Sequence, residues 1–100
     1  MLTTQLQLSD FLTLVGSSFQ VCIESDIPCR LELLDVEKIG DRLRSDPSSE
    51  SFSLLFKGPL DIFLPQKTYP LKHSQLGDLS IFLVPVAQAL DGLHYEAIFN

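Results

Sequence analysis

The sequence predicts an all-β fold, mainly antiparallel: a compact six-stranded small barrel or sandwich with one short N-terminal helix. Its 100 residues suffice for one hydrophobic core, and therefore for a single domain that spans residues 1–100. Several segments alternate apolar and polar residues, which is the period of a strand with one buried face. The five glycines are isolated and fall between such segments, where each would mark a turn.

The helix is expected at about residues 9–15. Apolar residues recur around Phe11, and either Ser9 or Asp10 could cap the N-terminus of the helix. Gly16 follows the last apolar residue of this segment and would end the helix.

Six segments have the composition of strands, namely residues 19–23, 29–34, 52–57, 68–73, 79–84 and 93–99. Because alternate residues of a strand share a face, we expect one common core built from Phe19, Val21, Leu31, Leu33, Phe52, Leu54 and Phe56. The segment 79–84 is apolar on both faces apart from Ser80, which predicts a strand that is covered on both sides.

The first two strands are expected to form a hairpin in which Val21 lies opposite Leu31 and Ile23 lies opposite Cys29. Cys22 then faces away from the core while Cys29 faces into it. Side chains on opposite faces of a sheet cannot reach disulfide geometry, so both cysteines are expected to be free thiols.

The connecting segments carry most of the turn-forming residues. Residues 39–51 contain glycine, proline and several serines among charged residues, and are expected to form a mobile surface loop. Residues 87–92 are expected to be a connection that ends in a turn. Pro70 should confine its strand to a sheet edge or a bulge. The last strand, 93–99, is the other candidate for an edge that is open to a partner.

Charge excludes two classes of partner. The net charge is −6, from thirteen acidic and seven basic residues, which argues against nucleic acid and against an anionic membrane surface. No apolar run approaches the length of a membrane span. No secretion signal is visible at the N-terminus, so a cytoplasmic location is expected.

The sequence offers too few candidate catalytic or metal-binding side chains to predict catalysis. His73 and His94 are the only histidines, and neither has a histidine or cysteine at the spacing of a zinc pair. The isolated glycines form no phosphate-binding loop. We therefore assign no catalytic residue, no metal site and no cofactor.

The second half of the chain nevertheless contains a distinctive pattern: Phe52-Ser-Leu-Leu-Phe-Lys-Gly-Pro59, Tyr69-Pro-Leu-Lys-His73, Leu76-Gly77, Phe82-Leu-Val-Pro-Val86 and Tyr95-Glu-Ala-Ile-Phe-Asn100. It resembles a family of small bacterial proteins of uncharacterised function, over about residues 9–100. Where such proteins often have Gln-Gly-Thr-Tyr, this chain has Gln66-Lys67-Thr68-Tyr69. The resemblance implies a bacterial origin, a compact β domain and a partner of the phage-tail or fibre type, but no activity.

The leading hypothesis is a non-catalytic domain for protein interaction or assembly, with a protein partner or a homo-oligomer. Its basis is the missing catalytic set together with 45% apolar residues, which is high for so small a core. The candidate interface is the proline-bounded connection, with Leu60, Ile62, Phe63 and Leu64; the alternative for these residues is that they cap the core. A small ligand-binding β-barrel is the second hypothesis, and an enzyme using one histidine with a carboxylate is the third.

Overall fold

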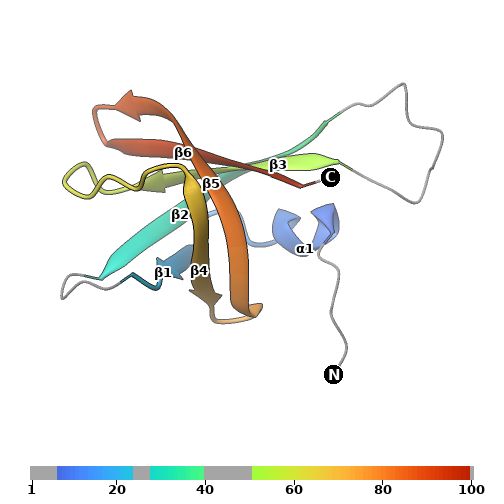
Figure 1. Ribbon diagram of the computed structural model, residues 1–100. Helices are drawn as coiled ribbons and strands as arrows, with labels where there is room; N and C mark the ends of the chain where they lie inside the picture. Colours follow the sequence, from blue (N-terminus) through green and yellow to red (C-terminus); the bar gives the residue numbers. More distant parts are fainter. Residues whose placement is uncertain (1–6, 24–27, 40–50, 100) are drawn as a thin grey trace.

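The computed structural model describes residues 7–23, 28–39 and 51–99. These residues form one helix and six strands (Figure 1): α1 (Leu8–Leu12), β1 (Ser18–Val21), β2 (Cys29–Lys38), β3 (Phe52–Gly58), β4 (Lys67–His73), β5 (Gly77–Ala89) and β6 (Gly92–Phe99). The strands close into a barrel in the order β1-β2-β3-β6-β5-β4, and every pair of neighbours is antiparallel. The predicted all-β fold with six strands and one short helix is confirmed.

The interior of the barrel is filled with side chains. All seven predicted core residues are buried, and they form one cluster with Tyr69, Leu71, Ile81, Leu83, Tyr95 and Ala97 from the other strands. Phe11 of α1 covers one end of the barrel, where its ring packs on those of Phe52 and Phe99 at centroid distances of 5.8 and 5.5 Å. At the other end, Leu64 from the β3–β4 connection joins the same cluster.

The helix is shorter than predicted, and its cap is different. Neither Ser9 nor Asp10 is the N-cap; that position is Gln7. Instead, the carboxylate of Asp10 accepts a hydrogen bond of 2.7 Å from the backbone N–H of Gln7, so it secures the first turn from within the helix. Gly16 lies beyond the helix with a φ of +92°, a conformation that favours glycine, and there the chain turns into β1.

The hairpin of β1 and β2 has the predicted faces but a different register. Val21 lies opposite Cys29, and Phe19 lies opposite Leu31, so the pairing is displaced by two residues from the expected one. The pairing ends at Val21 and Cys29, so Ile23 takes no part in it, and the backbone N–H of Cys22 donates to the carbonyl of Pro70 on β4 at 2.8 Å. A shift by two residues preserves the side-chain faces.

Both cysteines are free, Cys29 inside the barrel and Cys22 partly exposed. Alkylation of the denatured, unreduced protein is therefore expected to add two alkyl groups, as measured by intact mass. On the folded protein, Cys22 should react first, because Cys29 has no solvent-exposed surface. An intact mass without any addition would mean that the thiols are joined and that this part of the fold is wrong.

The expectation that the strand of Pro70 and the last strand are edge strands is wrong, because each has a neighbour on both sides, although part of each is paired on one side only. The last strand, β6, pairs with β3 along its length and with β5 at its start. The strand that contains Pro70, β4, pairs with both β5 and β1. Pro70 lies opposite Cys22, just beyond the end of β1, and its carbonyl accepts from Cys22; the missing N–H of Pro70 costs one ladder bond, to the carbonyl of the partly exposed Cys22.

Strand β5 is longer than expected and changes partner. Residues 77–83 pair with β4 and residues 84–89 pair with β6, with a register shift between Pro85 and Ala87. The segment 87–92 is thus mostly strand rather than a connection. The register shift accommodates Pro85, and the strand continues beyond it. The expectation that both faces of this strand are covered is wrong as well: Phe82 points outward and is 48% exposed.

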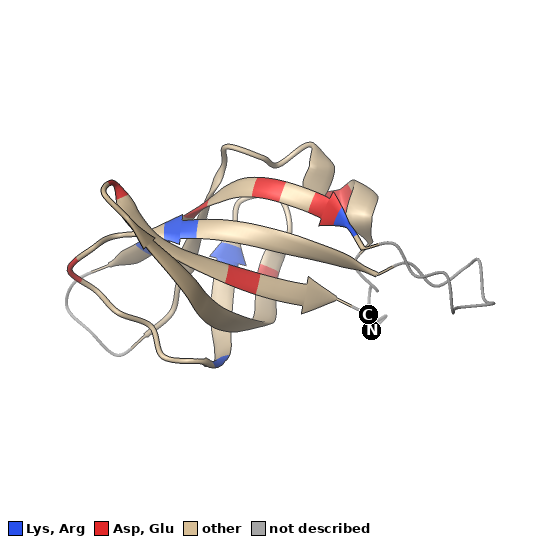
Figure 2. Cartoon of the chain, turned by 90° about the horizontal axis from the view of Figure 1, so that it is seen from above, with Lys and Arg blue, Asp and Glu red and all other residues tan. Residues whose placement is uncertain are grey.

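The predicted loop at 39–51 lies mostly outside the described residues; at its base, the N–H of Ile39 donates to the carbonyl of Ser51 at 2.9 Å. No Asp, Glu, Lys or Arg in the described ranges is buried, and these residues lie along the outer wall and the turns (Figure 2). Within the same ranges, no helix has the length and apolar character needed to cross a membrane.

Candidate binding surface at one end of the barrel

The connection between β3 and β4, residues 59–66, is tied to the barrel by two tyrosine hydroxyls. The backbone N–H of Leu64 donates to the hydroxyl of Tyr95 at 3.0 Å, and that hydroxyl donates to the carbonyl of Ile62 at 3.4 Å. The hydroxyl of Tyr69 donates to the carbonyl of Pro65 at 2.6 Å. These bonds fix the backbone of a segment that has no regular secondary structure.

This anchoring divides the four predicted interface residues into two groups. Leu64 is buried in the core, and Ile62 packs partly against it. Leu60 and Phe63 point outward and are 49% and 62% exposed. The interpretation as a core cap therefore holds for Ile62 and Leu64, which face the core. Leu60 and Phe63 face solvent, as residues of an interface would.

A third apolar residue stands at the same end of the barrel. Leu90, in the turn between β5 and β6, is fully exposed, and Figure 1 shows this turn at the same end of the barrel as the β3–β4 connection. The turn packs closely on the end of β3, because a Cβ atom at Gly92 would be only 2.7 Å from the carbonyl oxygen of Gly58. We call Leu60, Phe63 and Leu90 the crown. Sequence analysis missed Leu90, although a leucine directly before an Asp-Gly turn was a usable signal.

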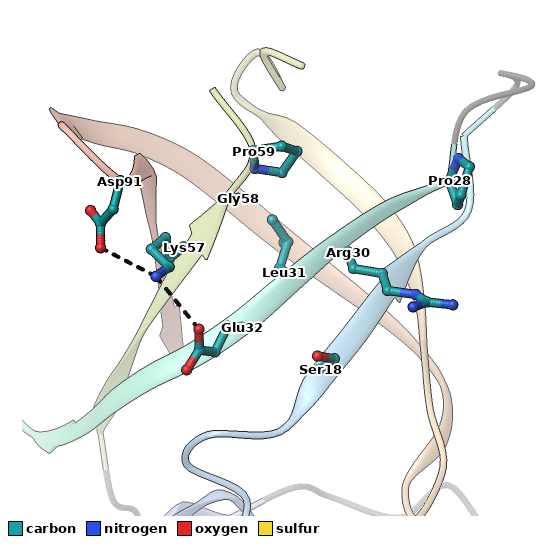
Figure 3. A pocket seen from close by; sticks show the side chains of 9 residues that line it. All are labelled: Ser18, Pro28, Arg30, Leu31, Glu32, Lys57, Gly58, Pro59 and Asp91. Atoms are coloured by element: carbon teal, nitrogen blue, oxygen red, sulfur yellow. Dashed lines mark hydrogen bonds and ion pairs between the residues drawn. The ribbon is translucent and has the colours of Figure 1, made fainter. Parts of the chain in front are cut away.

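A groove of about 460 Å³ adjoins the crown. It runs over the outer wall between β1, β2 and β3, with Pro59 and Asp91, the neighbours of Leu60 and Leu90, among the residues that line it (Figure 3). Arg30 lines the same groove from β2, and its guanidinium points away from Lys57. Of the described residues, none forms an ion pair or hydrogen bond with the guanidinium of Arg30.

The ammonium group of Lys57 lies between two carboxylates. It is 3.2 Å from Oδ2 of Asp91 and 3.7 Å from Oε1 of Glu32. The hydrogen bond with Asp91, with help from the charge of Glu32, raises the pKa of Lys57, and the same bond lowers the pKa of Asp91. Both groups stay charged at neutral pH, so this part of the groove offers paired charges rather than an acid or a base.

Both ring nitrogens of His73 are hydrogen-bonded within the fold. Its Nδ1 accepts hydrogen bonds from the backbone N–H groups of Gln75 (3.0 Å) and Leu76 (3.4 Å). In the neutral ring the proton is then on Nε2, which donates to Oγ of Ser17 at 3.0 Å. Ser17 itself donates to the carbonyl of Leu14 at 2.6 Å. These directions are the reverse of those that activate a serine nucleophile.

His94 lies on the outer face of β6, opposite Lys57. No carboxylate in the described part of the chain is hydrogen-bonded to either histidine. The same residues contain no cluster of three or more histidine, cysteine, aspartate or glutamate side chains that could hold a metal ion.

The anchoring of the β3–β4 connection has a measurable pH dependence. Burial is the main factor that raises the pKa of both Tyr69 and Tyr95. The folded protein thus holds the two phenolic protons more tightly than the unfolded chain, whose tyrosines titrate near pH ~10. The free energy of unfolding should accordingly decrease as the pH rises through and above this value.

Urea unfolding at several pH values between about 8 and 11 tests this expectation. The decrease should be smaller in the double variant Tyr69→Phe/Tyr95→Phe than in the wild type, because the variant has no phenolic proton to lose. An equal decrease in both proteins would show that the hydroxyls are not buried against the connection.

Comparison with known proteins identifies a family whose function is unknown. A family model described as a domain of unknown function, DUF6916, matches residues 6–99. No curated protein matches the chain, and neither does any solved structure.

Proposed function

The chain belongs to the DUF6916 family, whose function is unknown, and we propose that it is a non-catalytic interaction domain that assembles with a protein through the crown. The observation that carries this proposal is that the two connections at one end of the barrel carry three exposed apolar residues, Leu60, Phe63 and Leu90. The strands follow one another around a closed barrel, although each half of β5 pairs on one side only, so we expect a partner to bind mainly through exposed side chains at the barrel end.

The energies indicate what such a partner must contact. Full burial of a leucine or phenylalanine side chain contributes roughly 1.5–3 kcal/mol, and association costs at least about 4 kcal/mol in lost translational and rotational freedom. Leu60 and Phe63 are already about half buried, so they contribute only part of this amount and the three residues gain little beyond the cost of association. The partner therefore needs polar contacts beside them. The adjoining groove offers such contacts through Arg30, Lys57 and Asp91.

The connection is well suited to hold an anchor. Tyr69 and Tyr95 fix its backbone, so Phe63 loses little conformational freedom on binding. The resemblance noted in the sequence suggests a phage-tail-like or fibre protein as the first candidate partner. A second copy of the chain is the other candidate. The free thiols of Cys22 and Cys29 agree with a reducing, cytoplasmic setting. Ligand binding within the barrel is less favoured, because side chains fill the interior.

The substitution Phe63→Lys tests the proposal. It should weaken assembly at least about tenfold, since a central aromatic anchor contributes more than the residues at the rim of an interface. Light scattering at increasing protein concentration measures self-association, and quantitative pull-down from the source cells measures capture of another protein. The thermal melt should stay the same, because Phe63 is exposed.

Phe82→Lys is the matched control, since Phe82 is another exposed phenylalanine but lies on the barrel wall. The proposal requires that a complex is lost with Phe63→Lys and kept with Phe82→Lys. A wild-type protein that stays monomeric and captures nothing beyond what the Phe63→Lys variant captures would contradict it.

A further inference from the structure

A second surface, away from the crown, lies on the outer wall over β2, β3 and β6. The strand registers bring its residues together: Asp35 lies opposite Leu55 and Glu37 opposite Ser53 across β2 and β3. Across β3 and β6, Leu55 lies opposite Glu96 and Ser53 lies opposite Ile98. On β3 and β6 the alternate residues Leu54, Phe56, Tyr95 and Ala97 are buried in the core, and past the irregularity between Leu33 and Asp35 the residue Val36 of β2 packs partly against it, so these six side chains face outward. We call Asp35, Glu37, Ser53, Leu55, Glu96 and Ile98 the acidic face.

The centre of the acidic face is apolar. Ile98 is 50% exposed, and Leu55 is partly exposed. Val84 of β5 extends the apolar area, because it lies opposite Glu96 on the far side of β6 and is also partly exposed. Glu96 therefore stands among three apolar side chains and is itself partly covered.

The floor of the acidic face contains a polar group that the fold does not use. Ser53 is only 9% exposed although it points outward, and its hydroxyl forms no hydrogen bond with any residue in the described ranges. A nearly buried polar side chain is normally hydrogen-bonded to the protein, to a bound partner or to ordered water. The hydroxyl of Ser53 can therefore bond to a segment that covers the face.

The charges of the acidic face are not compensated within the described structure. Asp35, Glu37 and Glu96 form no ion pair with any described lysine or arginine. The lysine that is nearest along β3, Lys57, is already held by Asp91 and Glu32. Figure 2 shows the result, with acidic positions on β2 and β6 on either side of β3.

The acidic face combines uncompensated carboxylates, an apolar centre and the unused hydroxyl of Ser53. We propose that it docks a basic segment of a partner protein. In this segment, lysines or arginines alternate with apolar residues. The stems of long cationic side chains cover apolar surface while their charged ends reach carboxylates. Same-face neighbours on a strand are about 7 Å apart, so Asp35 and Glu37 match cations at alternate positions of an extended segment. Nucleic acid and anionic lipid are repelled by the same charges.

The test uses two short fluorescent peptides, one of alternating lysine and leucine and one of alternating lysine and serine. Binding is measured by fluorescence polarisation at low ionic strength and at about 0.15 M salt, where exposed charges more than about 8 Å apart are largely screened. The lysine–leucine peptide should bind more tightly, and the amide NMR signals of Ser53 and Ile98 should shift. The double variant Asp35→Asn/Glu37→Gln should weaken its binding by roughly fivefold or more.

The double variant Asp61→Asn/Asp78→Asn is the matched control. It removes the same charge from two exposed carboxylates in the β3–β4 connection and at the start of β5. Retained binding in this control, with loss in Asp35→Asn/Glu37→Gln, supports the proposal. If both variants lost binding equally, the effect would be one of net charge alone. If neither variant lost binding, the peptide would bind at another surface. Either result overturns the proposal, as does equal binding of the two peptides.

Discussion

Replacing Leu54 with aspartate is expected to leave the protein unfolded at room temperature. Leu54 has no exposed surface and lies in the core between Phe52 and Phe56 on the inner face of β3. The substitution removes the packing of a leucine, worth about 2–5 kcal/mol, and buries a carboxylate without a partner, which costs several kcal/mol more. The sum approaches the entire stability of a small domain, about 5–15 kcal/mol.

Circular dichroism and the dispersion of amide NMR signals measure the outcome. The control is Leu55→Asp, because Leu55 is the next residue on the same strand but faces outward and is partly exposed. This variant should fold and melt cooperatively, with a loss of about 1 kcal/mol that is typical of point substitutions. If Leu54→Asp melted like Leu55→Asp, the assignment of the two faces of β3 would be wrong.

The contrast between these two neighbours could be predicted from the sequence, because the period of two is a local property of the chain. All the predicted core positions on β1, β2 and β3 point inward. The same reasoning gave the correct faces for the hairpin of β1 and β2 although its register was wrong. A displacement by two residues leaves every side chain on its face, so the hydrophobic pattern cannot distinguish the two registers.

What the sequence could not show depends on contacts between distant residues. Just past the end of β1, the backbone N–H of Cys22 donates to the carbonyl of Pro70 on β4, and no local pattern predicts a bond between residues so far apart in the sequence. Closure of the barrel likewise decides that β6 and β4 have partners on both sides. A proline or a position at the end of the chain indicates an edge only while the sheet stays open.

The candidate site was predictable to a similar extent. Composition identified the segment that contains Leu60 and Phe63 but could not separate them from Leu64, which is buried. The separation depends on the hydroxyl of Tyr95, which comes from another strand and fixes Leu64 in place. Leu90 joins the crown only because the β5–β6 turn lies against the end of β3, a contact between elements that are far apart in the sequence.

Replacing Phe11 with alanine should cause the second large loss of stability, at the opposite end of the barrel from the crown. Phe11 is fully buried, and its ring contacts those of Phe52 and Phe99. A buried phenylalanine replaced by alanine costs about 3–5 kcal/mol, and 1 kcal/mol shifts the melting temperature of a domain of this size by about 4–8 °C. The melting temperature should therefore fall by about 15 °C or more.

The loss should be large because α1 has little other support. The helix has only five residues, which is too short to be stable by itself, so it stays folded only while Phe11 fills the mouth of the barrel. The alanine variant should consequently lose protection from hydrogen exchange first in the segment around α1, while the amides of β3 and β6 near the crown stay protected up to global unfolding.

Leu12→Ala is the matched control for Phe11→Ala. Leu12 is the adjacent residue of the same helix, but 52% of its surface is exposed, so its truncation should change the melting temperature by only a few degrees, about the effect of 1 kcal/mol or less. Calorimetry compares the two variants with the wild type. Similar melting temperatures for Phe11→Ala and Leu12→Ala would mean that the helix does not close the barrel. A large loss confined to Phe11→Ala would establish that this one ring joins the helix to the core.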